Sequence, residues 1–380
     1  MVVDYDLHSS VSARILRRAR FSCVVLFVVA VLLLEARAQN SAGQGTRASG
    51  IDTTQTESVV ETDLQKGTDL TRRGLFKEAI PLLLNARAEA PQDYMAGFNL
   101  ALCYLGVDDF KQAIDVLSDL HNNGHDTAAV NNLMAQAYVG DGQPQRAFQA
   151  LLAASIQTPT DEKLYSFVAD ACTDHYAYDL GLKVVDLGLV HLPASARLHY
   201  ERAVFLGRLD RLDEANPEFQ LASRLAPGSD LAYLALIQER LYEDKPAAAL
   251  ALAREGIKAG HTDYQMLSLL GTVLMYTGAS PGQPAFVEAR KALEASVAAQ
   301  PQYSTSQIAL GKLYMMEGRL SDAATHLEIG RRLEPQDPVV YKSLAEVYRG
   351  LGEREKAKNS LSMLSALLQE KAATNKPTQP

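Results

Sequence analysis

The sequence predicts an all-α protein built as a linear array of helix pairs. Three observations support this fold class. Prolines recur at a fixed interval of 34 residues, small residues recur at two fixed places within that interval, and no stretch alternates apolar and polar residues as a strand requires. A chain of 380 residues exceeds the roughly 250 to 300 residues at which a single hydrophobic core stops growing, and a repeat array has no such limit.

The prolines set the period. They follow one another at multiples of 34 residues, with an offset of six residues in one place, as Pro91, Pro159, Pro193, Pro227, Pro301 and Pro335. Proline ends a helix because it cannot donate the backbone hydrogen bond that a helix interior requires. We therefore expect nine repeats over residues 59–371, starting near residues 60, 94, 128, 162, 196, 230, 264, 304 and 338.

Small residues mark two positions of each repeat where paired helices are expected to approach most closely. The eighth position holds Gly67, Ala101, Ala135, Ala169, Ala203, Gly271, Gly311 and Ala345, with Ile237 as the exception. The twentieth position holds Ala79, Ala113, Ala147, Gly181, Ala215, Ala249, Ala289, Ala323 and Ala357. Tyrosine is frequent at the eleventh position, and glycine or aspartate at the fifteenth, where a turn between two helices is expected.

This pattern resembles the tetratricopeptide repeat (TPR) family over about residues 60 to 371. The resemblance implies a right-handed α-solenoid of about nine helix-turn-helix repeats. Two departures stand out. The sixth repeat carries Ile237 and Arg240 where the family has small and aromatic or apolar residues, so we expect irregular packing there. The seventh repeat has six extra residues, 279–284, between its helices, which form either a surface contact or a tolerated insertion.

The N-terminus has the order of a bacterial-type export signal. Basic residues up to Arg20 precede an apolar run, Phe21 to Leu34, and Ala36 and Ala38 fit the two small positions of a cleavage site. We predict a signal peptide over 1–38, a flexible linker over 39–58, a disordered tail over 372–380, and a periplasmic or secreted location. The alternative is an uncleaved helix that anchors the chain in the inner membrane, although the 14-residue run is shorter than the roughly 20 residues of a spanning helix.

Composition and motifs argue against several functions. The net charge of -8 becomes -10 without residues 1–38 (32 basic and 42 acidic residues remain), so binding to nucleic acid or to anionic lipid is disfavoured. The chain lacks P-loop, H-E-x-x-H and G-x-S-x-G motifs, and Asn122 to Gly124 interrupt the helix between His121 and His125. We therefore predict no catalytic residues, no cofactor and no metal. Cys103 and Cys172 lie two repeats apart and are expected to be buried free thiols.

The TPR resemblance implies a concave groove lined by the second, fifth, ninth and twelfth positions of each first helix. In this sequence those positions predict a partner-binding groove formed by Met95, Phe98, Leu102, Leu105, Asn132, Gln136, Ser166, Asp170, Arg197, Tyr200, Leu234 and Gln238. A mixed groove with an apolar patch near its start suits an extended peptide or an amphipathic helix. Apolar residues at this spacing are equally typical of core packing, and their exposure decides between the two.

The last predicted helix carries leucines that no further helix covers, and we predict an end-face contact through Leu361, Leu364 and Leu368 with a second copy or another partner. Taken together, the sequence predicts a non-catalytic protein-protein interaction scaffold or adaptor that binds a protein or peptide ligand. Two alternatives stay open, namely a membrane-tethered adaptor of an envelope complex and an α/α repeat enzyme acting on glycans. The enzyme would need pairs of inward-facing carboxylates.

Overall fold

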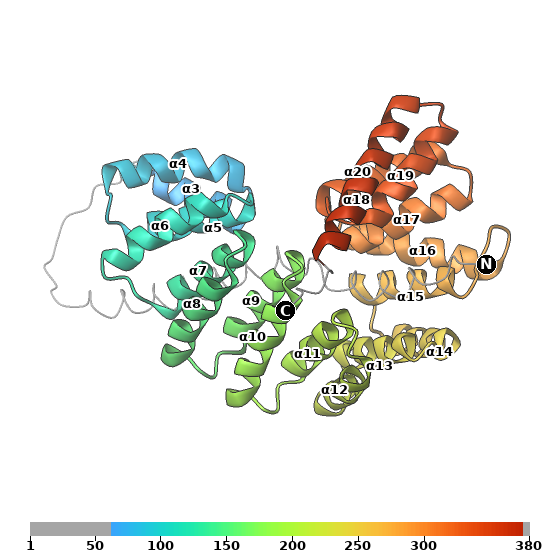
Figure 1. The fold of residues 1–380 in the computed structure, drawn as a ribbon, viewed down its shortest axis with the longest axis horizontal. Coiled ribbons are helices and arrows are strands. Elements are labelled where there is room, and N and C mark those ends of the chain that lie inside the picture. Colours follow the sequence, from blue (N-terminus) through green and yellow to red (C-terminus); the bar gives the residue numbers. More distant parts are fainter. Residues whose placement is uncertain (1–61, 375–380) are drawn as a thin grey trace, which may run out of the picture. The chain divides into compact units, whose positions relative to one another are not determined.

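The computed structural model describes the backbone of residues 62–374 and the side chains of residues 62–369. This part of the chain contains eighteen α-helices and no strand, and the helices follow one another as nine pairs (Figure 1). The predicted all-α solenoid and its nine repeats are confirmed. The predicted signal peptide over 1–38 and linker over 39–58 lie outside the described residues.

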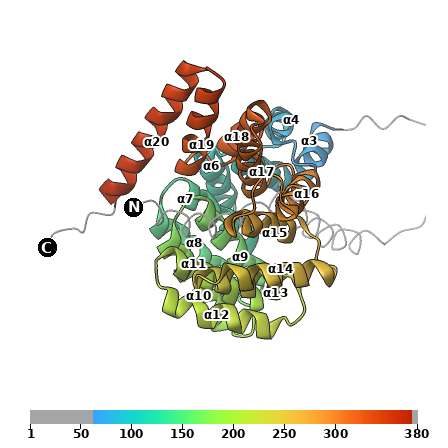
Figure 2. The ribbon, with the colours of Figure 1, turned by 90° about the vertical axis from the view of Figure 1, so that its right-hand side faces the viewer.

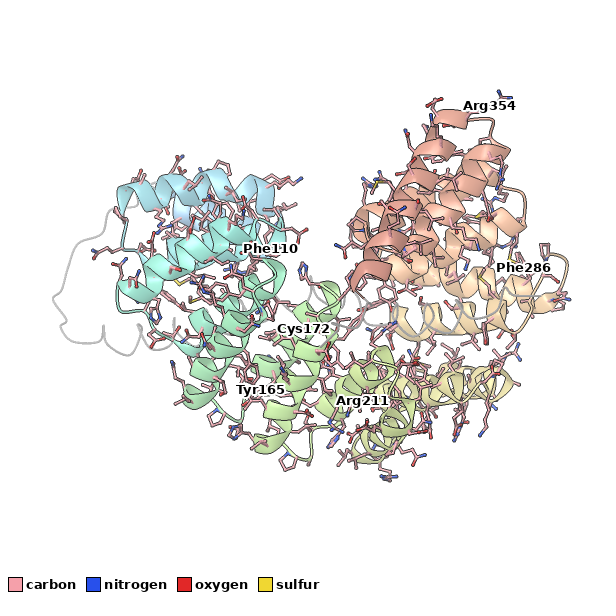
Figure 3. The ribbon with its side chains drawn as sticks, viewed as in Figure 1. Phe110, Tyr165, Cys172, Arg211, Phe286 and Arg354 are labelled. Carbon is pink, nitrogen blue, oxygen red and sulfur yellow. The ribbon has the colours of Figure 1, made fainter. Side chains whose placement is uncertain are left out.

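The helices group into two units, which we describe separately. The N-terminal unit, residues 62–192, contains four pairs: α3 (Asp63–Arg72) and α4 (Phe76–Glu89), α5 (Tyr94–Gly106) and α6 (Phe110–Asn122), α7 (Ala128–Gly140) and α8 (Pro144–Gln157), and α9 (Glu162–Asp174) and α10 (Tyr178–His191). Figure 3 shows side chains between the packed helices, with Phe110 and Tyr165 labelled in this unit.

The C-terminal unit, residues 193–374, contains five pairs: α11 (Ala196–Arg208) and α12 (Leu212–Leu225), α13 (Asp230–Tyr242) and α14 (Pro246–Lys258), α15 (Tyr264–Tyr276) and α16 (Pro284–Ala299), α17 (Ser304–Met316) and α18 (Leu320–Leu333), and α19 (Pro338–Gly350) and α20 (Arg354–Thr374). The last helix includes residues 372–374, which the sequence assigned to the tail. Ala372 and Ala373 are strong helix formers, and the chain contains no proline between Arg354 and Pro377 that would end the helix earlier.

The turn between the two helices of every repeat contains one residue with positive φ at the fifteenth position. The expected glycines and aspartates are there, for example Gly142 at φ 72° and Asp210 at φ 61°. Tyr176, at φ 58°, takes the same place in the fourth repeat. Because only glycine adopts this conformation without a steric penalty, the fold imposes the turn even on a bulky side chain.

Close helix approach explains the small eighth position. A Cβ atom on Gly67 would lie 2.7 Å from Cγ of Leu83, and one on Gly311 would lie 2.7 Å from Cγ of Leu327. Both leucines occupy the twenty-fourth position of their repeats and are fully buried. The eighth position must therefore stay small wherever the twenty-fourth is large.

The sixth repeat reverses this size pattern. Ile237 takes the eighth position and Ala253 the twenty-fourth, and both side chains are fully buried. The large residue has moved from the second helix to the first, which keeps the combined volume similar. The sizes of these two side chains are thus balanced, and the expectation of irregular packing elsewhere in the sixth repeat stays a prediction. Arg240, the other departure, is half-buried and forms an ion pair with Glu243.

Neighbouring repeats are also joined by hydrogen bonds to the periodic prolines. The fourth residue of a repeat reaches back to the carbonyl oxygen of the preceding repeat's proline: Tyr165 Oη donates to Pro159 at 2.8 Å, and Tyr341 Oη donates to Pro335 at 2.8 Å. Gln307 Nε2 donates to Pro301 at 2.7 Å. A proline carbonyl in the turn after one helix thus gains a hydrogen-bond partner from the next helix.

The six extra residues of the seventh repeat form a short turn before α16. Gln283 N donates to the carbonyl oxygen of Ser280 at 3.1 Å, and Ser280 N donates to Oε1 of Gln283 at 3.1 Å. Ala279 is buried, whereas the following Pro281 to Gln283 are exposed. The insertion therefore lies on the surface and leaves the helix packing of its repeat intact.

Candidate binding faces

The first helices of the repeats form the inner side of each unit. In the N-terminal unit, α3, α5, α7 and α9 contact one another in sequence, whereas among the second helices the main contact is between α8 and α10. In the C-terminal unit, α11 contacts α13, and α15, α17 and α19 contact in sequence, with no comparable contact between second helices of the described chain. Because neighbours approach more closely on the inner side of a curved stack, the first helices line the concave side of each unit.

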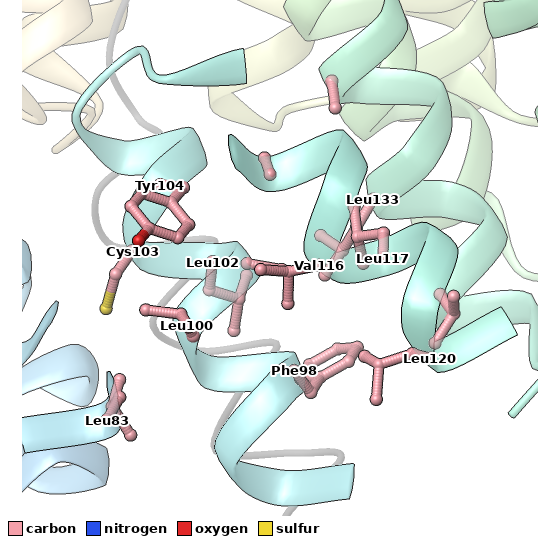
Figure 4. Packing of buried hydrophobic residues seen from close by; sticks show 14 of the residues in the cluster. Leu83, Phe98, Leu100, Leu102, Cys103, Tyr104, Val116, Leu117, Leu120 and Leu133 are labelled. Carbon is pink, nitrogen blue, oxygen red and sulfur yellow. The ribbon is translucent and has the colours of Figure 1, made fainter. Parts of the chain in front are cut away.

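In the N-terminal unit, the predicted apolar patch is largely core. Phe98 and Leu102 are only 3% and 2% exposed and belong to the hydrophobic cluster that joins α5, α6 and α7. Figure 4 shows both inside this cluster, with Phe98 toward Leu120 and Leu102 toward Val116. Met95 and Leu105 keep part of their side chains exposed. Partner binding through Met95 and Leu105 stays a prediction.

The predicted polar residues of α7 are held by internal hydrogen bonds. Asn132 Nδ2 donates to the backbone carbonyl of Leu164 on α9 at 2.7 Å, and Asn132 Oδ1 accepts from Nε2 of Gln136 at 2.7 Å. Ser166 is buried on α9, and Asp170, also on α9, is half-buried. Asn132 therefore joins two first helices, and Gln136 extends from it toward the inner surface.

In the C-terminal unit, the predicted residues of α11 combine charge and aromatic packing. Arg197 forms an ion pair with Glu201. Tyr200 is 1% exposed and packs edge-to-face against Phe219, with 5.8 Å between ring centroids. Burial raises the pKa of the Tyr200 hydroxyl well above its usual range. Its hydroxyl has no hydrogen-bond partner within the described chain.

Three consecutive first helices of the C-terminal unit each carry a buried polar side chain that has no hydrogen-bond partner within the described residues. They are Tyr200 on α11, Gln238 on α13 and Ser268 on α15, and we call these three residues the polar row. Gln238 is 1% exposed, and neither its Nε2 nor its Oε1 has a hydrogen-bond partner within the described residues. The Ser268 hydroxyl is fully buried and likewise has no partner there. More than nine in ten buried polar groups in proteins are hydrogen-bonded, so each of these three groups is an exception.

Two members of the polar row, Tyr200 and Gln238, were among the predicted groove residues, and Ser268 was not. Ser268 occupies the fifth position of the seventh repeat, the same position that Tyr200 occupies in the fifth repeat. The repeat register alone could therefore have identified it. Leu234, also predicted, is 5% exposed on α13 and contributes to the core.

Other chemistry is sparse in residues 62–369. These residues contain no group of three or more His, Cys, Asp or Glu side chains that could hold a metal ion. None of the helices within the described chain is both long enough and apolar enough to cross a membrane. Cys103 and Cys172 are buried and are not joined in a disulfide, as predicted.

Comparison with known proteins supports the repeat assignment. A family model described as Tetratricopeptide repeat matches residues 70–137 and 283–347. Anaphase-promoting complex subunit 7 of Arabidopsis thaliana is 34% identical over 140 residues, which is 36% of this chain and 24% of that protein. The chain thus spans about a quarter of the length of that relative.

Solved structures resemble the fold. The crystal structure of yeast Tom70 matches with a TM-score of 0.52 and 15% identity, covering 87% of this chain and 69% of that one. The Cut9 and Hcn1 hetero-tetramer of the anaphase-promoting complex gives a TM-score of 0.44 and 12% identity, covering 78% of this chain and 57% of that one. The likeness to Tom70 is one of fold.

Proposed function

We propose that this chain of tetratricopeptide repeats is a non-catalytic, exported scaffold that binds an extended peptide segment of another protein along the first helices of its C-terminal unit. Repeats of this kind are typical of protein-protein interaction scaffolds. The Arabidopsis relative is a subunit of a complex, which agrees with that class.

The unpaired amide of Gln238 carries the proposal. A buried polar group without a partner costs about 1 to 3 kcal/mol, and an apolar side chain of the same shape would avoid that cost. Folded proteins keep such a cost mainly where function requires the group. Because only 1% of Gln238 is exposed, its side chain would turn toward the inner surface when a partner molecule binds, and the partner would then give the amide the hydrogen bonds that the fold does not supply.

The chemistry of the polar row favours a peptide backbone as its ligand. A glutamine side chain donates through Nε2 and accepts through Oε1, as a peptide group does, so one Gln238 amide can pair with one peptide group of an extended chain. The hydroxyls of Tyr200 and Ser268 add sites that can donate or accept on the preceding and the following first helix of the sequence. Extended peptides are commonly bound through such backbone hydrogen bonds, with side-chain pockets adding specificity.

Export is proposed from the sequence alone. The basic segment, apolar run and small residues before Gln39 support cleavage after Ala38 and a periplasmic or secreted protein. N-terminal sequencing of the protein recovered from expressing cells tests this part of the proposal. A mature chain that begins at Gln39 supports it, and an uncleaved chain in the membrane fraction overturns it in favour of the membrane-tethered adaptor.

Peptide binding can be tested with a phage-displayed library of random linear peptides selected on the full chain. The affinity of selected peptides would then be measured by isothermal titration calorimetry for the wild type and for Gln238→Met, which removes the amide and keeps the length of the side chain. We expect Gln238→Met to weaken binding by about tenfold or more, as the loss of one buried hydrogen bond implies.

The matched control is Val190→Asp on α10, where the side chain is 74% exposed on a second helix. This control should bind the selected peptides as the wild type does. Failure to select any peptide would overturn the proposal, and so would selected peptides that bind Gln238→Met as tightly as the wild type.

A further inference from the structure

The twenty-fourth position of the repeat is buried in every repeat except the last. Eight residues at this position are fully buried: Leu83, Leu117, Leu151, Val185, Phe219, Ala253, Leu293 and Leu327. Leu361 occupies the same position in the ninth repeat and is 54% exposed. The same side chain in the same register thus has a different environment at this end of the described array.

The difference follows from what packs against each second helix. α18 lies between two first helices, α17 and α19, and its Leu327 is buried by them. α20 packs against α19, and within the described residues no helix makes a comparable contact with its other side. Figure 2 shows α20 beside α19 at the edge of the C-terminal unit.

The uncovered side of α20 is apolar over more than two turns. Leu361 and Leu368 are 54% and 49% exposed, and Leu364 is half-buried between them. No charged residue occurs from Asn359 to Leu368. We call Leu361, Leu364 and Leu368 the α20 stripe. Exposed apolar stripes of this kind on soluble proteins mark interaction sites.

The neighbouring α19 has charged rather than apolar exposed residues, so the exposed apolar surface at this end belongs to α20 alone. Its exposed residues at the fifth, ninth and twelfth positions are Lys342, Glu346 and Arg349. These charged side chains are compatible with solvent, so α19 needs no cover of its own. The apolar part of this end is therefore one helix face.

We propose that the α20 stripe is covered by the same stripe of a second copy, so that the protein forms a two-fold symmetric dimer. The spacing of three and four residues in the stripe is that of the contact face of paired helices. In an antiparallel pair, Leu361 lies against the partner subunit's Leu368, and Leu364 lies near the two-fold axis. The stripe is thus complementary to itself, as a two-fold interface requires.

Head-to-tail stacking of copies is disfavoured by the first described helix. α3 is rich in charge, with Asp63, Lys66, Asp69 and Arg72 within its ten residues, and Asp69 pairs with Arg72 at 3.5 Å. If α3 covered the α20 stripe, its charged side chains would lose their contact with water against apolar residues, which costs free energy. An interface between unlike ends would also extend into a ring or an open filament, whereas the two-fold pair closes with two copies.

The oligomeric state of the full chain tests the proposal. Sedimentation equilibrium over a range of concentrations should show a reversible monomer-dimer equilibrium for the wild type. The Leu361→Asp, Leu368→Asp double variant should raise the dimer dissociation constant by about a hundredfold or more, because it places charge in the core of the interface. The matched control, Ile156→Asp with Val190→Asp, changes residues that are 82% and 74% exposed on α8 and α10, and should dimerise as the wild type does.

A cysteine at the two-fold axis tests the geometry. Ser365→Cys should form a disulfide-linked dimer on mild oxidation, because the two copies of residue 365 lie close together. Lys358→Cys lies on the same side of the helix two turns earlier, and its two copies would be about 20 Å apart in an antiparallel pair, so it should not cross-link. Circular dichroism confirms that each variant is folded.

Four outcomes would each overturn the proposal: a wild-type monomer at every concentration, growth beyond the dimer, a dimer that survives the double aspartate variant, or cross-linking through residue 358 and not 365. The dimer does not depend on the peptide proposed for the polar row. Peptide binding by a monomer, or dimerisation without peptide binding, separates the two proposals.

Discussion

A Cβ atom added to Gly271 would lie 2.5 Å from Cγ of Leu293 and 3.1 Å from the carbonyl oxygen of Ala289. Gly271 is on α15, and the other two residues are on α16 of the same repeat. The missing side chain of one helix thus makes room for the leucine and the backbone of the other, at the eighth and twenty-fourth positions that recur along the chain.

Gly271→Ala should therefore destabilise the protein despite the higher helix propensity of alanine. Overpacking of a tight contact costs about 1 to 3 kcal/mol. Replacing glycine by alanine in a helix gains no more than about 1 kcal/mol in helix propensity, so the cost prevails. Unfolding in urea measures the change. Combined with Leu293→Ala, the cost of Gly271→Ala should shrink, because the two residues share one space. Strictly additive effects would contradict the close contact.

We expect substitutions at a turn glycine and at a turn aspartate to change the free energy of unfolding in opposite directions. Gly142, at φ 72°, has no atom within 4 Å of a built Cβ, so Gly142→Ala should cost about 1 kcal/mol through backbone strain alone. Asp210 has φ 61°, and Asp210→Gly should stabilise by up to about 1 kcal/mol for the same reason. Chemical denaturation of both variants tests this, and equal signs would show that the turn conformation is not the cause.

Gln238 and Asn132 should respond in opposite directions to loss of their amides. Gln238→Met removes a buried amide without partners and should raise the free energy of unfolding by about 1 kcal/mol or more. Asn132→Leu removes the bond to the Leu164 carbonyl and should lower it by about 1 to 3 kcal/mol. Guanidinium unfolding of the two variants measures both. A loss of stability in Gln238→Met would mean that the amide supports the fold.

Cys103 predicts a dependence of stability on pH. Burial raises the pKa of the Cys103 thiol to about 11, outweighing the opposite effect of the hydrogen bond with Thr71, whose Oγ1 lies 3.1 Å from Sγ. Below about pH 8 the folded and unfolded states both keep the proton, so this contribution to stability is complete. As pH rises toward 11, the unfolded state releases its proton first, and the free energy of unfolding falls.

The loss attributable to Cys103 should be about 2 kcal/mol at pH 10.5. Unfolding of the wild type and of Cys103→Ala at pH 8 and pH 10.5 isolates it, because the cavity left by alanine costs the same at both values while the thiol contribution does not. The stability gap between the two proteins should narrow at the higher pH. An unchanged gap would show that Cys103 does not titrate between the two values.

The 34-residue repeat allowed the fold to be predicted from the sequence. The eighth and twentieth positions, the prolines and the turn glycines are each set by a steric or hydrogen-bonding requirement that recurs in every repeat, so agreement among nine repeats fixed the register. Ile237 shows the limit of that reasoning. A single position was compared with its counterparts, whereas packing depends on the summed volume of Ile237 and Ala253.

The binding face was harder to predict because residues that line a groove and residues that pack in the core recur at the same helical spacing. Phe98 and Leu102 repeat as groove residues would, yet they are buried against α6 and α7. Residues three or four positions apart share one face of a helix, and their spacing alone does not show whether that face contacts solvent or a neighbouring helix. The missing partners of Gln238 depend on which groups lie near it in space, which single-position patterns do not contain.

The turn before α16 has a practical consequence. It accommodates six additional residues while Gly271 and Leu293 keep the same packing as their counterparts, and Pro281 to Gln283 point to solvent. Lengthening an already exposed connection adds little entropic cost. This connection is accordingly a suitable place to graft an epitope or attach a fluorophore, and the corresponding connections of other repeats, such as the one at Gly142, are candidates for the same engineering.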